Sequence, residues 1–297
     1  MRQEAAYLAV QSICREYNVS ISRMCAIAGI ARASYYKWLN REIPEAELLN
    51  EAIAEAVMSI HKEYPDKGHR RIRDDLLRDY GFDVSDRRVL RICRILGIKS
   101  TIKYERNSCT VNAKDPQHIS ENILKRNFRA DAPNEKWLTD VTEFKYYEGS
   151  EKRKVYLSAI LDLYDRRIVA YVIGDSNSNP LVYDTFKKAV ASYPDAHPLF
   201  HSDRGFQYTN AVFHEMLTEH GMTQSMSRVG KCIDNGPIEG FWGILKRECY
   251  YGKRFESRED IVDMIESYIY YYNNRRYQRQ LGVVTPIEKY EQYLSAA

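Results

Sequence analysis

The spacing of apolar residues changes near residue 136, and the change separates the predicted elements into two groups. Before it, apolar positions recur every three or four residues, which is the period of amphipathic helices. After it, runs rich in β-branched and aromatic residues predict strands that alternate with helices, an α/β layout. The helices predicted in the first part cover 4–17, a short segment ending at 28, 31–39, 45–64, 69–80, 86–96 and 120–127. The second part should contain three strands within 137–147 and 154–174, strands at 198–202 and 223–226, and helices at 180–192, 210–220, from 235 onward, at 259–274 and after 286.

A helix-turn-helix motif is predicted from the segment ISRMCAIAGIARASYYKWLN, residues 21–40. Gly29 separates two short helices, as in motifs whose second helix contacts DNA. That second helix would present Arg32 and Lys37 to a phosphate backbone or a groove. Glycine-linked helical hairpins also occur in proteins that do not bind DNA, so this motif alone leaves its function open.

A second motif of the same kind follows in HRRIRDDLLRDYGFDVSDRRVLRICRILGIKS, residues 69–100. Gly81 should break the first helix, Ser85 should cap the second and Gly97 should end it. Residues 67–106 hold 12 lysines and arginines against 6 aspartates and glutamates, so the motif is basic. A solvated basic face is the plain alternative to DNA binding. The side chains predicted here to contact DNA are Arg70, Arg71, Arg87, Arg88 and Arg91.

The charge of the chain is divided unevenly between its two parts. The whole chain of 297 residues has a formal net charge of +3, and 44% of its residues are hydrophobic and 29% charged, as in ordinary globular proteins. Residues 1–130 hold 23 basic and 17 acidic side chains, whereas residues 131–297 hold 21 and 24. A basic first part and an acidic second part suggest a polyanion-binding region joined to one that gathers carboxylates.

Cysteine placement and hydropathy exclude several other classes. The six cysteines are scattered without a CxxC pair, which favours reduced thiols in a cytosolic protein. His61, His69, Cys93 and Cys109 are spaced too widely for a zinc knuckle, so we expect no zinc site. No apolar run approaches 18 residues and the N-terminus does not resemble a secretory signal, so we expect no membrane association.

Three carboxylates occupy positions at which they could meet. Asp140 lies within the first predicted strand, Asp203 directly follows the apolar strand PLFHS, and Glu239 lies in the first turn of the helix after Asn235. Ligands gather at the carboxyl ends of strands in α/β sheets. Three neighbouring carboxylates repel one another unless a cation joins them, and hard divalent ions prefer oxygen ligands. Glu239 also has a simpler explanation, since acidic residues stabilise helix N-termini.

These positions lie within longer motifs, and at this point the chain resembles a known family. The matching segments are KWLTDVTEF, HSDRGFQYT and DNGPIEGFWGILKRE. Between Asp140 and Asp203 lie 62 residues, and between Asp203 and Glu239 lie 35. The earlier segment YPDKGHRRIRDDL and the later segment YYNNRRYQRQLGVVTP also match. The chain resembles the retroviral-integrase-like DDE transposases, most closely the larger-frame (OrfB) product of bacterial insertion sequences, over about residues 20–290.

The resemblance implies an RNase H-like catalytic core, with a mixed five-stranded sheet and flanking helices, preceded by all-α helix-turn-helix domains. Asp140, Asp203 and Glu239 would bind two Mg²⁺ ions, which Mn²⁺ could replace. Lys246, seven residues after Glu239, matches the family lysine and shares its helix face, so it would hold a phosphate of the DNA. The expected domains are 1–45, 46–105, a linker 106–133, the core 134–255 and a helical tail 256–297.

We therefore interpret the chain as a bacterial, cytoplasmic and nucleoid-associated transposase. Its partners would be the terminal inverted repeats, target DNA, further copies of itself in a dimer or larger assembly, and a fusion or partner from an upstream frame. Two alternatives stay open: a catalytically silent DNA-binding regulator derived from an element, and a Mg²⁺-dependent nuclease that does not join strands.

Several other side chains allow two interpretations each. Asp162 could point into the site or serve the structure, and His201 could support Asp203 or simply pack. Trp242 could stack on a base or lie in the core, while Asn235 is interpreted chiefly as a helix cap. Tyr268, Tyr271 and Tyr272 have core spacing, and the phosphate contacts in this tail are assigned to Arg275 and Arg276.

Overall fold

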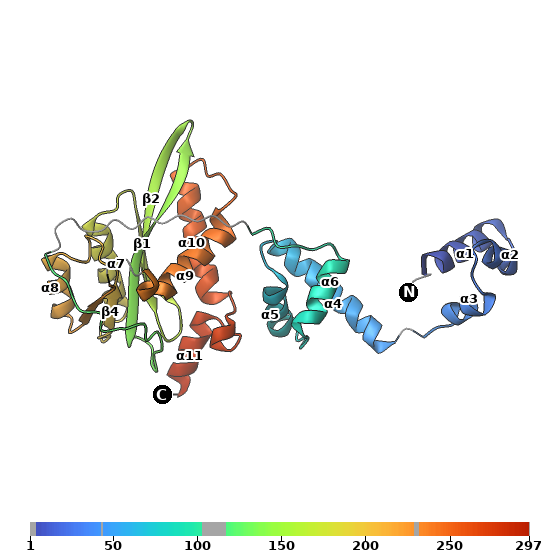
Figure 1. Cartoon of the computed structure of the whole chain (residues 1–297), viewed down its shortest axis with the longest axis horizontal. Coiled ribbons are helices and arrows are strands. Elements are labelled where there is room, and N and C mark those ends of the chain that lie inside the picture. The colour runs from blue at the N-terminus through green and yellow to red at the C-terminus, as the bar shows by residue number, and fades with distance from the viewer. Residues whose placement is uncertain (1–3, 43, 103–116, 229–231, 297) are drawn as a thin grey trace. The chain divides into compact units, whose positions relative to one another are not determined.

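The computed structural model describes residues 4–42, 44–102, 117–228 and 232–296 (Figure 1). The chain forms two compact units, Met1–Ala56 and Val57–Ala297, which divide within helix α4 (Glu45–Glu63). Cys109 and the part 106–116 of the predicted linker lie outside the described residues.

The first unit contains the predicted helix-turn-helix. Its elements are α1 (Glu4–Tyr17), α2 (Ile21–Ile27) and α3 (Arg32–Leu39). Gly29 turns the chain between α2 and α3 with a φ of +65°, a conformation that glycine adopts without strain. A small core joins the three helices through Tyr7, Val10, Cys25, Ile30 and Tyr35. The helical prediction for this region is confirmed.

The second helical pair opens the larger unit. It consists of α5 (His69–Asp79) and α6 (Asp86–Ile95). As predicted, Ser85 caps α6 by accepting a hydrogen bond from the backbone N–H of Arg88 at 3.3 Å. The apolar stripe of α6 is buried at Val89, Ile92 and Cys93, which leaves Arg87 and Arg91 exposed. The sequence pattern therefore separates a packed face from a basic face.

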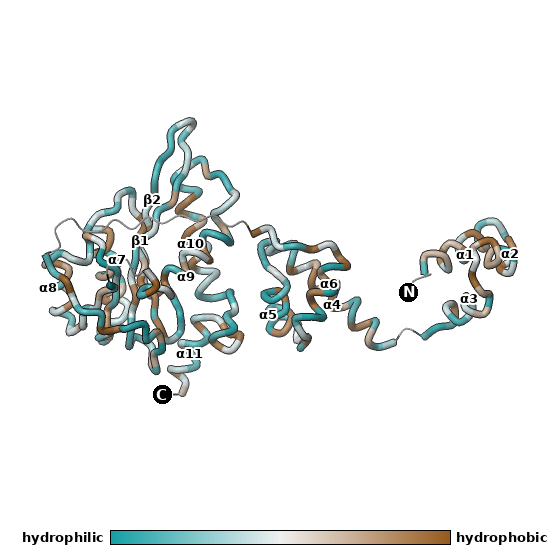
Figure 2. The backbone as a smooth tube through the Cα atoms, viewed as in Figure 1, coloured by the Kyte–Doolittle hydropathy of each residue, from teal (hydrophilic) through white to brown (hydrophobic). Residues whose placement is uncertain are grey.

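A five-stranded mixed sheet forms the centre of the larger unit. Its strands are β1 (Lys136–Glu148), β2 (Glu151–Asp162), β3 (Ile168–Gly174), β4 (Leu199–Ser202) and β5 (Thr223–Met226). The order is β3-β2-β1-β4-β5, with the first three strands antiparallel and β4 and β5 parallel to β1. The far end of the long β1–β2 hairpin is hydrophilic (Figure 2). The predicted fold class, a mixed five-stranded sheet with flanking helices, is confirmed.

Helices cover both faces of this sheet because successive side chains of a strand point to opposite faces. Trp137 packs with α7 (Asn179–Ser192) and α8 (Ala211–Glu219), whereas Leu138 packs with α9 (Gly236–Leu245) and α10 (Arg258–Asn274). Five residues of α10 are buried in the same apolar cluster as Leu138. The predicted helical tail, 256–297, therefore begins as part of the core. The remaining elements are a 3₁₀ turn (Cys232–Asn235), a π-helical turn (Lys246–Tyr250), a 3₁₀ turn (Arg279–Leu281) and α11 (Pro286–Ala296).

One predicted helix, at 120–127, is wrong. This segment has no regular structure, turns at Lys125 and Arg126, and lies beside the edge strand β5. The backbone N–H groups of Ile123 and Leu124 donate to Ser225 Oγ, and the N–H of Met226 donates to the carbonyl of Glu121. The edge strand β5 supplies hydrogen-bond partners for backbone groups of this segment. A short isolated helix would have to pair these groups internally.

Candidate active site

Asp140 and Asp203 are neighbours because of the register between β1 and β4. The two strands are parallel, with Leu138 paired to His201. Asp140 lies two residues after Leu138, and Asp203 lies two residues after His201, just past the end of β4, so both side chains come to the same face of the sheet beside each other. The Asp203 carboxylate also accepts a hydrogen bond of 2.8 Å from the N–H of Gly205. A side chain at Gly205 would approach this carboxylate oxygen to 3.0 Å, which explains the glycine.

Glu239 lies on α9, which covers this face of the sheet. Pro237 occupies the first turn of α9, where its missing N–H would be unpaired in any case. Asn235 occupies the N-cap position of α9 as expected, but its side chain makes no capping hydrogen bond. Instead its amide donates to the carbonyl of Thr139 at 3.1 Å, which ties the start of α9 to the strand position beside Asp140.

Burial raises the pKa values of all three carboxylates, and neighbouring charges raise two of them further. Burial raises the pKa of Asp140 well above its usual range, and the charges of Asp203 and Glu239 raise it further. Burial also raises the pKa of Asp203, and burial together with the Asp203 charge raises that of Glu239. The arrangement therefore penalises three negative charges in one place and favours a cation among them.

Trp242 lies on the same helix as Glu239 and forms a hydrogen bond with Asp140. Its indole N–H donates to Asp140 Oδ2 at 3.0 Å, and the residue is only 6% exposed. Of the two predicted roles, the structure therefore supports packing, combined with a hydrogen bond to a carboxylate. This bond favours the ionised form of Asp140 and counteracts the effect of burial.

Replacing Trp242 by phenylalanine should raise the pKa of Asp140 further, because the ring stays packed while the donor is lost. The pKa can be followed by carboxyl NMR titration of the metal-free protein. Trp137→Phe is the matched control, since the indole N–H of Trp137 has no hydrogen-bond partner among the described residues. An unchanged Asp140 titration in Trp242→Phe would contradict this role.

Asp234, five residues before Glu239, has a different function. Its carboxylate is fully buried and accepts hydrogen bonds from Arg126, Arg228 and Asn122 at 2.6 to 3.1 Å. The Arg228 guanidinium foremost, and then Arg126, hold its pKa well below the usual range. No local pattern predicts these two arginines: Arg126 is distant from Asp234 in the chain, and the spacing of Arg228 six residues before Asp234 is no recognised motif.

Asp162 and His201 serve the structure of the core. Asp162 accepts backbone N–H bonds from Asn134, Tyr164 and Asp165 at 2.7 to 3.3 Å, which closes the turn after β2. The two ring nitrogens of His201 lie 2.9 and 3.1 Å from serine hydroxyls of the β5 region. Both side chains are completely buried.

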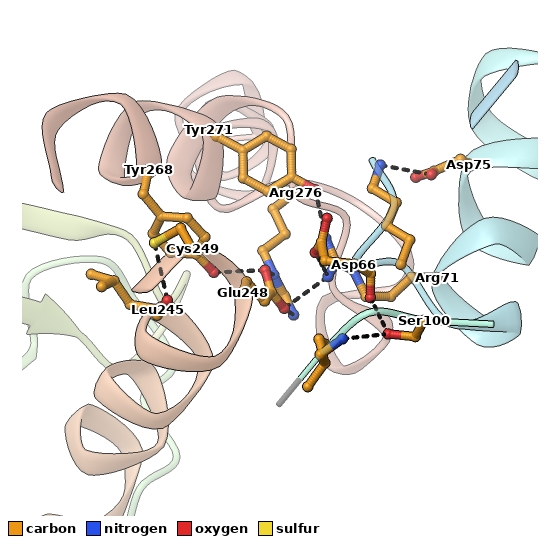
Figure 3. Close-up of polar contacts among 12 residues, drawn as sticks. Asp66, Arg71, Asp75, Ser100, Leu245, Glu248, Cys249, Tyr268, Tyr271 and Arg276 are labelled. Carbon is orange, nitrogen blue, oxygen red and sulfur yellow. Dashed lines mark hydrogen bonds and ion pairs between the residues drawn. The ribbon is translucent and has the colours of Figure 1, made fainter. Parts of the chain in front are cut away.

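The predicted DNA-contacting side chains differ in their surroundings. Arg32, Lys37, Arg70, Arg87, Arg91 and Arg275 are exposed, and Arg88 is partly exposed. Lys246 is partly exposed, with its ammonium 5.2 Å from the centre of the Phe144 ring. Arg71 and Arg276 are instead ion-paired with Glu248 inside the unit (Figure 3). Tyr268 and Tyr272 are buried, which confirms their core assignment.

The donor set fits a hard divalent ion in its chemistry, since all three acids offer carboxylate oxygens. In the part of the chain that the structure describes, no three His, Cys, Asp or Glu side chains are gathered closely enough to form a metal site as they stand. Asp140 and Asp203 form a partly buried pair, whereas Glu239 is exposed on α9. Its side chain would therefore have to turn toward the pair to complete the ligand set.

Comparison with known proteins assigns the family. Models of the integrase core domain match residues 130–232 and 239–294, and a model of an HTH-like domain matches residues 48–106. The chain belongs to the insertion-sequence transposases, and its enzyme class is that of the DDE transposases and integrases.

Two relatives support this assignment. The chain is 42% identical to a transposase-like protein of Haemophilus influenzae, over 71% of this chain and 95% of that protein. It is 37% identical to the putative transposase InsK for insertion sequence element IS150 of Escherichia coli, over 74% and 76% of the two chains. The catalytic core domain of HTLV-2 integrase covers 55% of this chain and 99% of its own, with 19% identity and a TM-score of 0.41.

None of the described helices has the combination of length and apolar composition that crossing a membrane requires.

Proposed function

We propose that this transposase binds the terminal inverted repeats of an insertion sequence, cuts one strand to free a 3′-hydroxyl and joins that hydroxyl to another phosphodiester. The observation that carries the proposal is the meeting of Asp140 and Asp203 at the edge of two parallel strands, with Glu239 on the helix that covers them. A bound cation would relieve the repulsion between these carboxylates, and the proposed reaction requires the same cation.

The chain's own residues would prepare this site in three ways. Asp140 and Asp203 would hold two divalent ions, and Glu239 would complete the ligand set. The Trp242 indole orients Asp140 and favours its ionised form. When bound, Mg²⁺ or Mn²⁺ would activate the attacking hydroxyl and stabilise the leaving 3′-oxygen during in-line displacement at phosphorus.

DNA must approach an acidic site, so basic groups have to hold it there. Lys246 would bind a phosphate near the carboxylates, since it begins the π-helical turn that continues α9. The exposed arginines of α5 and α6 would hold the backbone of the terminal repeats. Arg32 and Lys37 of the first unit, and Arg275, would add further phosphate contacts. Joining two element ends calls for a dimer or larger assembly on DNA, with or without a product of an upstream frame.

The test is to incubate the protein with Mg²⁺ and a labelled duplex that carries the ends of its own element. Joined strands are the expected product. Cleavage without joining would favour a Mg²⁺-dependent nuclease. Specific binding without chemistry, also after fusion to the upstream frame, would leave a DNA-binding regulator and overturn the catalytic proposal.

Replacing Arg91 by glutamine should weaken DNA binding about equally for all sequences. The slope of log affinity against log salt should fall by about one, because one phosphate contact with its released counterion is lost. Binding should be measured over a range of salt concentrations. Lys187→Gln on α7 is the matched control, since α7 covers the face of the sheet away from Glu239. Equal slopes for wild type and Arg91→Gln would remove α6 from the DNA interface.

A further inference from the structure

Glu248 is a buried carboxylate on the helical segment that carries Glu239. Its side chain is only 7% exposed. It lies in the π-helical turn Lys246–Tyr250, which follows α9 without interruption. It lies nine positions after Glu239, about 13 Å along the helix axis. Single π-helical turns occur often at functional sites.

Side chains of the core and of α5 contact Glu248 from opposite sides (Figure 3). From the core, Arg276 binds both carboxylate oxygens, at 2.8 and 3.1 Å, and the Tyr268 hydroxyl donates at 2.8 Å. From α5, Arg71 NH1 lies 2.8 Å from Glu248 Oε1. The Glu248 carboxylate therefore joins the HTH-like pair of helices to the helix of the active site.

Arg71 is held firmly in this position. Its NH1 also lies 2.9 Å from Asp66 Oδ2, and its NH2 donates to the Tyr271 hydroxyl at 2.7 Å. The side chain is 19% exposed, so most of the guanidinium faces protein. This geometry uses the donors that a phosphate contact would need.

We propose that Glu248 is a positioning residue, through which the docking of α5 controls the placement of α9 and its Glu239. The proposal rests on the proposed strand-transfer function and adds a route from DNA-end recognition to the catalytic carboxylates. It also changes the role of Arg71, which acts on the site through Glu248 rather than by contact with DNA.

The physical reason is that a buried carboxylate tolerates little loss of its partners. Burial alone would raise the pKa of Glu248, but Arg276 and Arg71 offset this and lower it. If α5 moves away, Glu248 keeps only its core partners and its segment must adjust. Further contacts make α5 and α6 move together with the C-terminal segment: Arg279 bridges Asp74 and Asp86 at 2.8 to 3.0 Å, and the Tyr277 hydroxyl donates to Asp79 at 2.6 Å.

The test uses the full chain with Arg71→Gln. We expect DNA affinity and its salt slope to stay at wild-type values, while strand joining at saturating end DNA falls about tenfold, a typical coupling between two sites. Hydrogen exchange of the amides over 238–250 should increase without DNA. Arg71→Lys keeps the charge but loses the planar fork, so it should recover only part of the rate.

Two comparisons separate this coupling from a lost DNA contact. Arg70→Gln removes an exposed charge from the neighbouring position of α5 and should lower affinity and salt slope. The double variant Arg71→Gln/Glu248→Gln should join strands no more slowly than Glu248→Gln alone, because both changes break one interaction.

Either of two results would overturn the proposal. One is a salt slope for Arg71→Gln that falls as it does for Arg70→Gln, with an unchanged joining rate. The other is a double variant whose loss is the product of the two single losses. If the wild-type protein joins no strands, the proposed function fails, and hydrogen exchange alone decides whether Arg71 positions α9.

Discussion

Replacing Glu239 by glutamine should reduce strand joining by about a thousandfold or more, the loss typical for a group that acts in the transition state. Glutamine keeps the size of the side chain but cannot supply the charge that a divalent ion requires. Joined and cleaved products should be measured with labelled element ends in Mg²⁺. Asp140→Asn and Asp203→Asn should behave alike, because the three carboxylates serve one site.

The fold of Glu239→Gln should be intact. Since burial and the charge of Asp203 raise the pKa of Glu239, removing the Glu239 charge relieves repulsion in the metal-free protein. Mg²⁺ should raise the unfolding temperature of the wild type more than that of the variant. Glu215→Gln, an exposed change on α8, is the matched control and should join strands normally. Full joining activity in Glu239→Gln would exclude Glu239 from the site.

Replacing Phe241 by alanine should lower the free energy of unfolding by about 3 to 5 kcal/mol, as expected for a large aromatic side chain removed from a core. Phe241 is 1% exposed, and its ring centre lies 4.7 Å from that of Tyr272 on α10 and 5.0 Å from that of Trp242. It therefore anchors the helix that carries Glu239. Denaturant unfolding measures the loss.

The control for Phe241→Ala is Ile233→Ala, just before α9. Ile233 is 56% exposed, so its truncation should change stability by less than about 0.5 kcal/mol. Similar losses in the two variants would mean that Phe241 does not anchor α9. A large loss confined to Phe241→Ala would link the stability of the unit to the placement of the catalytic helix.

The sequence by itself determined most elements and the identity of the acidic residues. Helical period, glycine turns and the Ser85 cap depend on neighbours in the chain, so local patterns were sufficient to predict α5, α6 and the strands. The family motifs predicted Asp140, Asp203 and Glu239 as a set. The β1–β4 register brings the two aspartates together, whereas Glu239 is exposed on α9. The predicted helix at 120–127 failed because an edge strand far along the chain pairs with it.

Only the tertiary structure decided which charged side chains face each other. Nothing near Arg71 or Arg276 distinguishes them from the exposed Arg70 and Arg275, yet the first two pair with the buried Glu248. The bond from Trp242 to Asp140 likewise joins residues from a helix and a strand far apart in sequence. Such pairs form when packing brings distant segments together and removes water from their polar groups, and neither condition leaves a periodic pattern in the sequence.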